Sequence, residues 1–125
     1  MNFDPLDRLF SIAEKFPNQI AVVEPERSIN YEDFLLLVKA IAFRINSIVS
    51  SEAHPRILIH LPQGIEAYAS MFATLMVGGF YSPSNTSASK EKQKIIFSQF
   101  AAGTIITEDA FMSVFQGRKD EAYCL

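Results

Sequence analysis

Hydrophobic and polar positions follow two different periods along this chain, and together they predict alternating helices and strands. Apolar residues that recur every three or four positions are typical of amphipathic helices, whereas short unbroken apolar runs between turn residues are typical of strands. The pattern predicts helices at residues 5–16, 31–49, 65–77 and 87–102, strands at 20–23, 27–30, 56–61, 80–83 and 104–107, and a last helical turn or two at 108–115. Alternation of strands and helices in the second half favours an α/β fold with a mostly parallel sheet flanked by helices.

Several residues mark where these elements begin and end. Asp4 and Asn30 each precede a helix and are suited to accept hydrogen bonds from its first free amide groups. Gly78 and Gly79 follow helix 65–77, and glycine readily adopts the left-handed conformation found at helix C-termini. We therefore expect this pair to stop the helix and to allow a close approach that leads into a buried strand.

The helices carry more apolar surface than so small a chain is expected to bury. On helix 65–77 the polar residues Glu66, Ser70 and Thr74 form one narrow stripe, and residues 34–43 are also mostly apolar. A chain of 125 residues buries only around two-thirds of its unfolded surface. We therefore expect exposed apolar patches on both helices, and such patches usually mark an interface.

Composition and charge narrow the class of protein. The 125 residues suffice for one domain, and 49% of them are apolar, which argues against disorder. A net charge of −3 offers no basic surface for nucleic acid or for a membrane, and the longest apolar stretches are broken or too short to span a bilayer. The single cysteine, Cys124, excludes an internal disulfide and fits a reducing compartment. We therefore expect a cytoplasmic domain.

His60 is the histidine best placed to contact a ligand. It lies near the carboxyl end of strand 56–61, and ligands of α/β sheets bind outside such strand ends, beside loops such as 60–64 and 82–85. The alternative is a structural histidine that a neighbouring backbone group satisfies or that faces solvent past the sheet. His54 lies in a loop and has no visible partner in the sequence.

The remaining candidates have weaker support. A charged cluster at the start of helix 87–102 is either a docking site for an anion or an acidic carrier protein, or a solvated helix face; its members are Lys90, Glu91, Lys92 and Lys94. Cys124 has no histidine or metal-spaced partner nearby, so a free thiol is expected. Two histidines and one cysteine make a metal site improbable.

One segment is more specific than a generic α/β pattern. Residues 73–85, ATLMVGGFYSPSN, resemble the second core motif of the adenylate-forming superfamily, which holds acyl-CoA synthetases, luciferases and adenylation domains of nonribosomal peptide synthetases. Segments 16–34, 56–79 and 87–109 resemble the family's neighbouring segments in the same order. Ser87, Ala88 and Ser89 stand where the family usually begins the next helix with a proline. The resemblance covers about residues 6 to 110.

The resemblance implies a piece of an enzyme. Complete members activate a carboxylic acid with ATP and Mg²⁺ as an acyl-adenylate and pass the acyl group to a thiol. Their phosphate loop, adenylate and ribose contacts and lid lysine find no counterpart here, so we predict no catalytic, cofactor-binding or metal-binding residue in this chain. Residues 1–125 then form a single partial domain, the N-terminal segment of an adenylation (AMP-binding) domain.

Two functions remain open at this point. In the first, the chain is the N-terminal scaffold of such a ligase, and the aromatic residue Tyr81 favours the branch of the family that activates amino acids. Its partners would be the remainder of the domain or a second chain, with CoA or a carrier protein as acceptor. In the second, it is a non-catalytic interaction or dimerisation module derived from a truncated or split adenylation domain.

Overall fold

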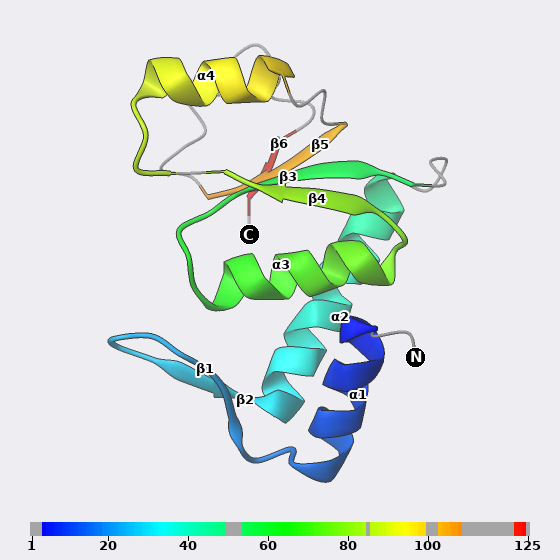
Figure 1. The fold of residues 1–125 in the computed structure, drawn as a ribbon. Coiled ribbons are helices and arrows are strands. Elements are labelled where there is room, and N and C mark those ends of the chain that lie inside the picture. The colour runs from blue at the N-terminus through cyan, green and yellow to red at the C-terminus, as the bar shows by residue number, and fades with distance from the viewer. Residues whose placement is uncertain (1–3, 50–53, 85, 100–102, 109–121, 125) are drawn as a thin grey trace.

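A parallel sheet with helices on both faces forms the body of the molecule, and a small hairpin stands beside it (Figure 1). The computed structural model describes residues 4–49, 54–84, 86–99, 103–108 and 122–124. Its elements, in chain order, are α1 (Pro5–Lys15), β1 (Ile20–Val23), β2 (Ser28–Asn30), α2 (Tyr31–Ile48), β3 (Arg56–His60), α3 (Ile65–Met76), β4 (Phe80–Pro83), α4 (Lys90–Gln99), β5 (Thr104–Thr107) and β6 (Ala122–Cys124). Among the described residues, no helix is both long and apolar enough to cross a membrane.

The larger sheet has the order β4-β3-β5-β6, and all its strand pairs are parallel. This confirms the predicted α/β class, but two details of the prediction are wrong. Strand β6 follows β5 in the chain and pairs with it, although the sequence pattern predicts 104–107 as the last strand. Strand β4 is an edge strand rather than a buried one, so Phe80 stays 61% exposed and Tyr81 38% exposed. The helical turns predicted at 108–115 lie outside the described residues, apart from Glu108.

Side chains of the central strand β3 alternate between two cores. Ile57 and Ile59 belong to one apolar cluster with residues of α2 and α3. Leu58 and His60 point to the opposite face, because successive strand residues alternate, and α4 lies on that side (Figure 1). Since β3 is covered on both faces, four of its five residues are buried.

Hydrogen bonds at the helix starts confirm both predicted caps. An Asp4 carboxylate oxygen accepts from the Leu6 amide at 2.9 Å, and the Asn30 side-chain oxygen accepts from the Asp33 amide at 2.8 Å. The apolar surplus predicted on α2 is also confirmed, because Leu36 is 59% exposed and Phe43 80% exposed.

The prediction of an exposed apolar patch on α3 is wrong. Ser70 and Thr74 are fully buried, and their hydroxyls donate to the carbonyls of Glu66 and Ser70, at 2.7 and 2.8 Å. Bonds to a carbonyl one turn earlier satisfy a hydroxyl inside a core. The polar stripe of α3 therefore faces inward over most of its length, and the larger apolar side chains of this helix are buried or half-buried.

The two adjacent glycines have different structural roles. Gly78 has φ 78°, and the amides of Gly78 and Gly79 donate to Leu75 and Thr74, which closes helix α3 in a Schellman motif. At Gly79 the constraint is space, since a Cβ there would lie 2.6 Å from the carbonyl oxygen of Pro55. The same oxygen accepts from the Phe80 amide at 2.8 Å and so begins the pairing of β4 with β3.

Candidate functional site

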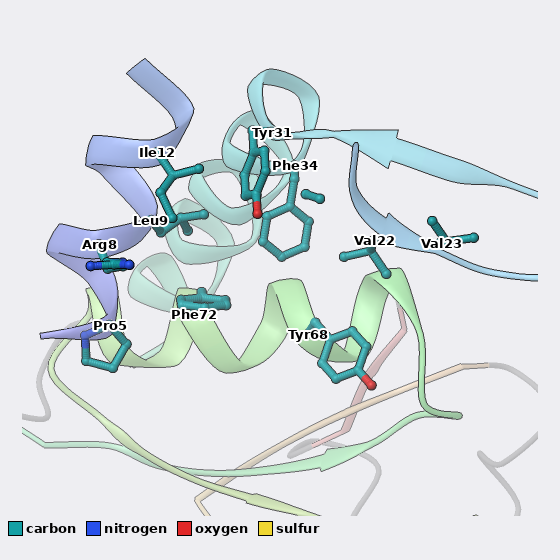
Figure 2. A pocket seen from close by; sticks show the side chains of 11 residues that line it. Pro5, Arg8, Leu9, Ile12, Val22, Val23, Tyr31, Phe34, Tyr68 and Phe72 are labelled. Carbon is teal, nitrogen blue, oxygen red and sulfur yellow. The ribbon is translucent and has the colours of Figure 1, made fainter. Parts of the chain in front are cut away.

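An apolar groove opens between α1, the β1–β2 hairpin, α2 and α3 (Figure 2). Its volume is about 490 Å³. We define the apolar groove by its lining residues, which are Pro5, Arg8, Leu9, Ile12, Ala21, Val22, Val23, Tyr31, Phe34, Tyr68 and Phe72. Phe34 and Phe72 meet edge to face, with ring centroids 5.9 Å apart, and join α2 to α3 there. Ligand pockets in proteins are typically of this size and lined mostly by apolar side chains.

A cluster of charged side chains holds the hairpin against α3 and so fixes one wall of the groove. Arg27 donates to Glu24 at 2.9 and 3.2 Å and to both oxygens of Glu66 at 2.6 Å. Glu24 also accepts from the Ile65 amide at 2.6 Å and thereby caps α3 from a strand pair far away in the sequence. This backbone hydrogen bond, and then Arg27, hold the pKa of Glu24 below its usual value. Hydrogen bonds to the two carboxylates raise the pKa of Arg27.

Gly64 makes this cap possible. A Cβ at Gly64 would lie 2.5 Å from the Glu24 carboxylate oxygen that caps the helix. The loop after β3 therefore needs a residue without a side chain at the point where the hairpin reaches it.

A second group of polar side chains is buried where the carboxyl end of the sheet meets the start of α4. This polar cluster consists of His60, Ser84, Gln93 and Thr107, none more than 8% exposed. His60 Nδ1 and Ser84 Oγ are 3.0 Å apart, and His60 is the register partner of Thr107. The Gln93 amide group donates to the carbonyls of Thr86 and Ala88 at 3.1 and 2.8 Å.

The polar cluster has the properties of a structural site. Burial lowers the pKa of His60 to about 4, and the neighbouring Gln93 side chain offsets this only in part. The ring is therefore neutral at pH 7 and inaccessible to solvent. His60 does not face solvent, and the neighbour of its Nδ1 is the Ser84 side chain rather than the backbone group that the structural alternative supposed.

The two loops singled out at this sheet end do lie together. A hollow of about 390 Å³ is lined by Leu61 and Gln63 from one loop and by Ser84 and Thr86 from the segment after β4. The Gln63 side chain donates to the Tyr68 hydroxyl at 2.6 Å, which orients it along the start of α3. The sequence predicted that the two loops meet because each follows a strand of a parallel sheet.

The other candidate residues contribute to the surface or to the fold. Lys90, Lys92 and Lys94 are exposed on α4, as a solvated helix face requires. His54 has a partner that the sequence did not reveal: its Nδ1 lies 3.0 Å from the Gly78 carbonyl oxygen, at the α3–β4 turn. The backbone of Cys124 lies in β6. Within the described ranges, no three His, Cys, Asp or Glu side chains gather closely enough to hold a metal ion.

Comparison with known proteins identifies the family of this chain. A family model described as AMP-binding enzyme matches residues 9–123. The chain belongs to this family. No curated protein matches the chain by sequence.

Solved structures of adenylate-forming enzymes share the fold of this family member. Coronafacic acid ligase from Pectobacterium brasiliense is similar over 98% of this chain and 26% of its own, with a TM-score of 0.86 and 19% identity. The NpsA N-terminal subdomain from Klebsiella oxytoca, in complex with 3-hydroxyanthranilyl-AMSN, is similar over 96% of this chain and 30% of its own, with a TM-score of 0.79 and 20% identity. O-succinylbenzoate coenzyme A synthetase from Bacillus subtilis, in complex with AMP, gives a TM-score of 0.75 at 16% identity, over 94% of this chain and 30% of its own. The chain thus spans between 26% and 30% of the length of these three proteins.

Proposed function

We propose that this chain is the N-terminal scaffold of an adenylate-forming ligase that activates a carboxylic acid with ATP as an acyl-adenylate, for transfer to the thiol of CoA or of a carrier protein. The observation that carries the proposal is the family match over residues 9–123, combined with a coverage of only 26% of coronafacic acid ligase. The chain therefore corresponds to the first part of such an enzyme, and by itself it is not catalytically competent.

The arrangement of the described residues supports a scaffold role. The one histidine at the carboxyl end of the sheet is neutral and sealed inside the polar cluster, so it is not available as an acid or a base. ATP and Mg²⁺ would be held by the remainder of the domain, in the same polypeptide or in a second one. Tyr81 on β4 favours an amino acid as the activated acid, and the single cysteine favours a cytoplasmic location.

Carboxylate-dependent ATP–pyrophosphate exchange tests the proposal. The assay is run with the isolated 125-residue chain, and then with the segment that carries the phosphate loop and lid lysine, taken from sequence downstream of Leu125 or from a neighbouring gene. We expect no exchange by the chain alone and acid-dependent exchange once the second segment is present. Exchange catalysed by the isolated chain would show that it holds a nucleotide site, and the scaffold proposal would then be wrong.

A further inference from the structure

We propose that residues 86–99, which comprise α4 and the short segment before it, open from the sheet as one unit, and that Gln93 is the latch that keeps them closed. We call residues 86–99 the strap. This inference goes beyond the proposed function, because it concerns a movement within the chain and not its place in an enzyme. Three features carry it: the weak apolar anchoring of α4, the hydrogen bonds of Gln93, and the groups beneath the strap.

Helix α4 lacks the apolar anchor of the other described helices. Helices α1, α2 and α3 each bury apolar side chains. Among the side chains of α4 that the structure describes, the buried one is the polar Gln93, at 3% exposure, whereas Ile95 is 55% exposed and Ile96 half-buried. Helix α4 also lies apart from the three other helices, on the opposite face of the sheet (Figure 1). Segments with few buried apolar contacts open at a lower free energy than the core, so α4 is suited to local opening.

Gln93 ties the strap together and holds it on the sheet. Its side-chain amide donates to the carbonyls of Thr86 and Ala88, at 3.1 and 2.8 Å, and its backbone amide donates to the carbonyl of Ser89 at 2.9 Å. These bonds join the segment before α4 to the first turn of the helix. The same side chain also interacts with His60 on the central strand β3. One residue therefore makes the strap a single unit and connects it to the sheet.

The groups beneath the strap favour its opening. His60 and Thr107 are register partners on β3 and β5, so they share the face on which α4 lies, and both are fully buried. The Thr107 hydroxyl forms no hydrogen bond with the part of the chain that the structure describes. A buried polar group without a partner costs free energy, and water supplies the missing bond when the strap opens. The closed state thus carries a cost that the open state relieves.

Opening changes the carboxyl end of the sheet. Ser84 and Thr86 line the hollow there, and the Ser84 hydroxyl lies 3.0 Å from His60 Nδ1. With the strap closed, His60 is neutral and inaccessible to solvent. With the strap open, water reaches the ring, and one wall of the hollow moves with Thr86. The strap therefore controls access to the one polar cluster at this end of the described sheet.

Native-state hydrogen exchange of the full 125-residue chain, followed by NMR at several low urea concentrations, tests the opening. We expect the amides of α4 from Gln93 onward to exchange about tenfold faster or more than those of β3 and α3, because local opening requires less free energy than global unfolding. Their exchange should also depend less on urea, because local opening exposes less surface. If the α4 amides exchange with the rate and urea dependence of β3, or show no protection at all, the inference is overturned.

Substitution of Gln93 tests the latch. Gln93→Ala removes the side-chain bonds and keeps a strong helix former, so a loss of protection does not come from helix propensity. It should speed the exchange of the α4 amides about tenfold and leave β3 and α3 unchanged. Lys94→Ala is the matched control, because Lys94 is the exposed neighbour on the same helix, and it should leave exchange unchanged. Equal acceleration in all elements, or none in α4, would show that Gln93 is not a latch.

Carbethoxylation by diethyl pyrocarbonate, followed by mass spectrometry, tests what the strap covers. The reagent modifies accessible neutral imidazoles, and the exposed His54 is the internal reference. We expect His60 to react more slowly than His54 in the wild type, and about tenfold faster in Gln93→Ala than in the wild type, in parallel with the α4 amides. A His60 rate that Gln93→Ala leaves unchanged would overturn the inference. Neither experiment involves ATP, so the proposed function stands or falls separately in the pyrophosphate exchange assay.

Discussion

The adjacent glycines at the α3–β4 turn allow two physical effects to be separated by substitution. At Gly78 the constraint is conformational, because φ is 78°. At Gly79 the constraint is steric, because a Cβ would meet the Pro55 carbonyl oxygen at 2.6 Å, and also the side chains of Pro55 and Thr74 at 3.1 and 3.2 Å. Alanine and asparagine at each position should therefore give different orders of stability.

The expected magnitudes follow from these contacts. A left-handed residue other than glycine costs about 1–2 kcal/mol, and asparagine costs less than alanine because it visits this conformation more readily. At Gly79 the backbone of β3 or β4 must move by several tenths of an ångström. Overpacking of this kind costs about 1–3 kcal/mol, and a weakened Phe80–Pro55 hydrogen bond adds about 1 kcal/mol. For a chain of 125 residues, 1 kcal/mol shifts the melting temperature by about 4 °C.

Thermal unfolding followed by circular dichroism measures the difference. The protein concentration is kept low and fixed, since self-association would raise the apparent stability. We expect Gly79→Ala and Gly79→Asn to lower the melting temperature similarly, by roughly 8–16 °C. Gly78→Ala should lower it by roughly 4–8 °C, and Gly78→Asn by less. If asparagine rescues position 79, or if Gly79→Ala costs less than Gly78→Ala, the steric explanation is wrong.

Two further predictions concern ionisable groups. The pKa of His60 falls from 6.5 in the unfolded chain to about 4 in the fold, so the unfolded state binds more protons between these values and stability should decrease as the pH falls from 6.5 toward 4. The loss of unfolding free energy is at most about 3 kcal/mol. Urea unfolding at several pH values measures it, and the free energy of unfolding should depend less on pH in His60→Leu than in the wild type or in the exposed control His54→Gln. Equal pH profiles would contradict the assignment of this pH dependence to His60. Glu24→Gln weakens the cap of α3 and the bonds to Arg27, so it should lower the melting temperature more than Glu26→Gln in the same turn; equal losses would mean that the cap contributes nothing.

Local signals in the sequence sufficed for most of the elements. Asp4 and Asn30 cap helices as predicted, and the position of Gly78 after an apolar helix indicated its left-handed conformation. These features depend on residues within one turn of each other, so a single sequence contains them. Helix α4 begins at Lys90, three residues after the predicted start at 87, whereas the predicted end at 100–102 lies outside the described residues.

Features that depend on distant residues could not be predicted. The bond from Ile65 to Glu24 joins residues 41 apart, and nothing near either one marks it. Periodicity identified a polar stripe on α3 but not its direction, and Thr74 at the end of that stripe is fully buried. The polar cluster is another such case. From the sequence, Gln93 is expected on a solvated helix face, and only the fold brings it next to His60.

Proline at position 83 restricts how this sheet can grow. The amides of Phe80 and Ser84 donate to β3, so Tyr81 and Pro83 face the open side of β4. Proline has no amide hydrogen, and Tyr81 is therefore the one residue of β4 with a backbone donor for an incoming strand. Although Phe80 and Tyr81 make this edge attractive to apolar chains, it is a poor template for the continuous ladders from which aggregates form. Orderly extension of the sheet is therefore disfavoured at the β4 edge.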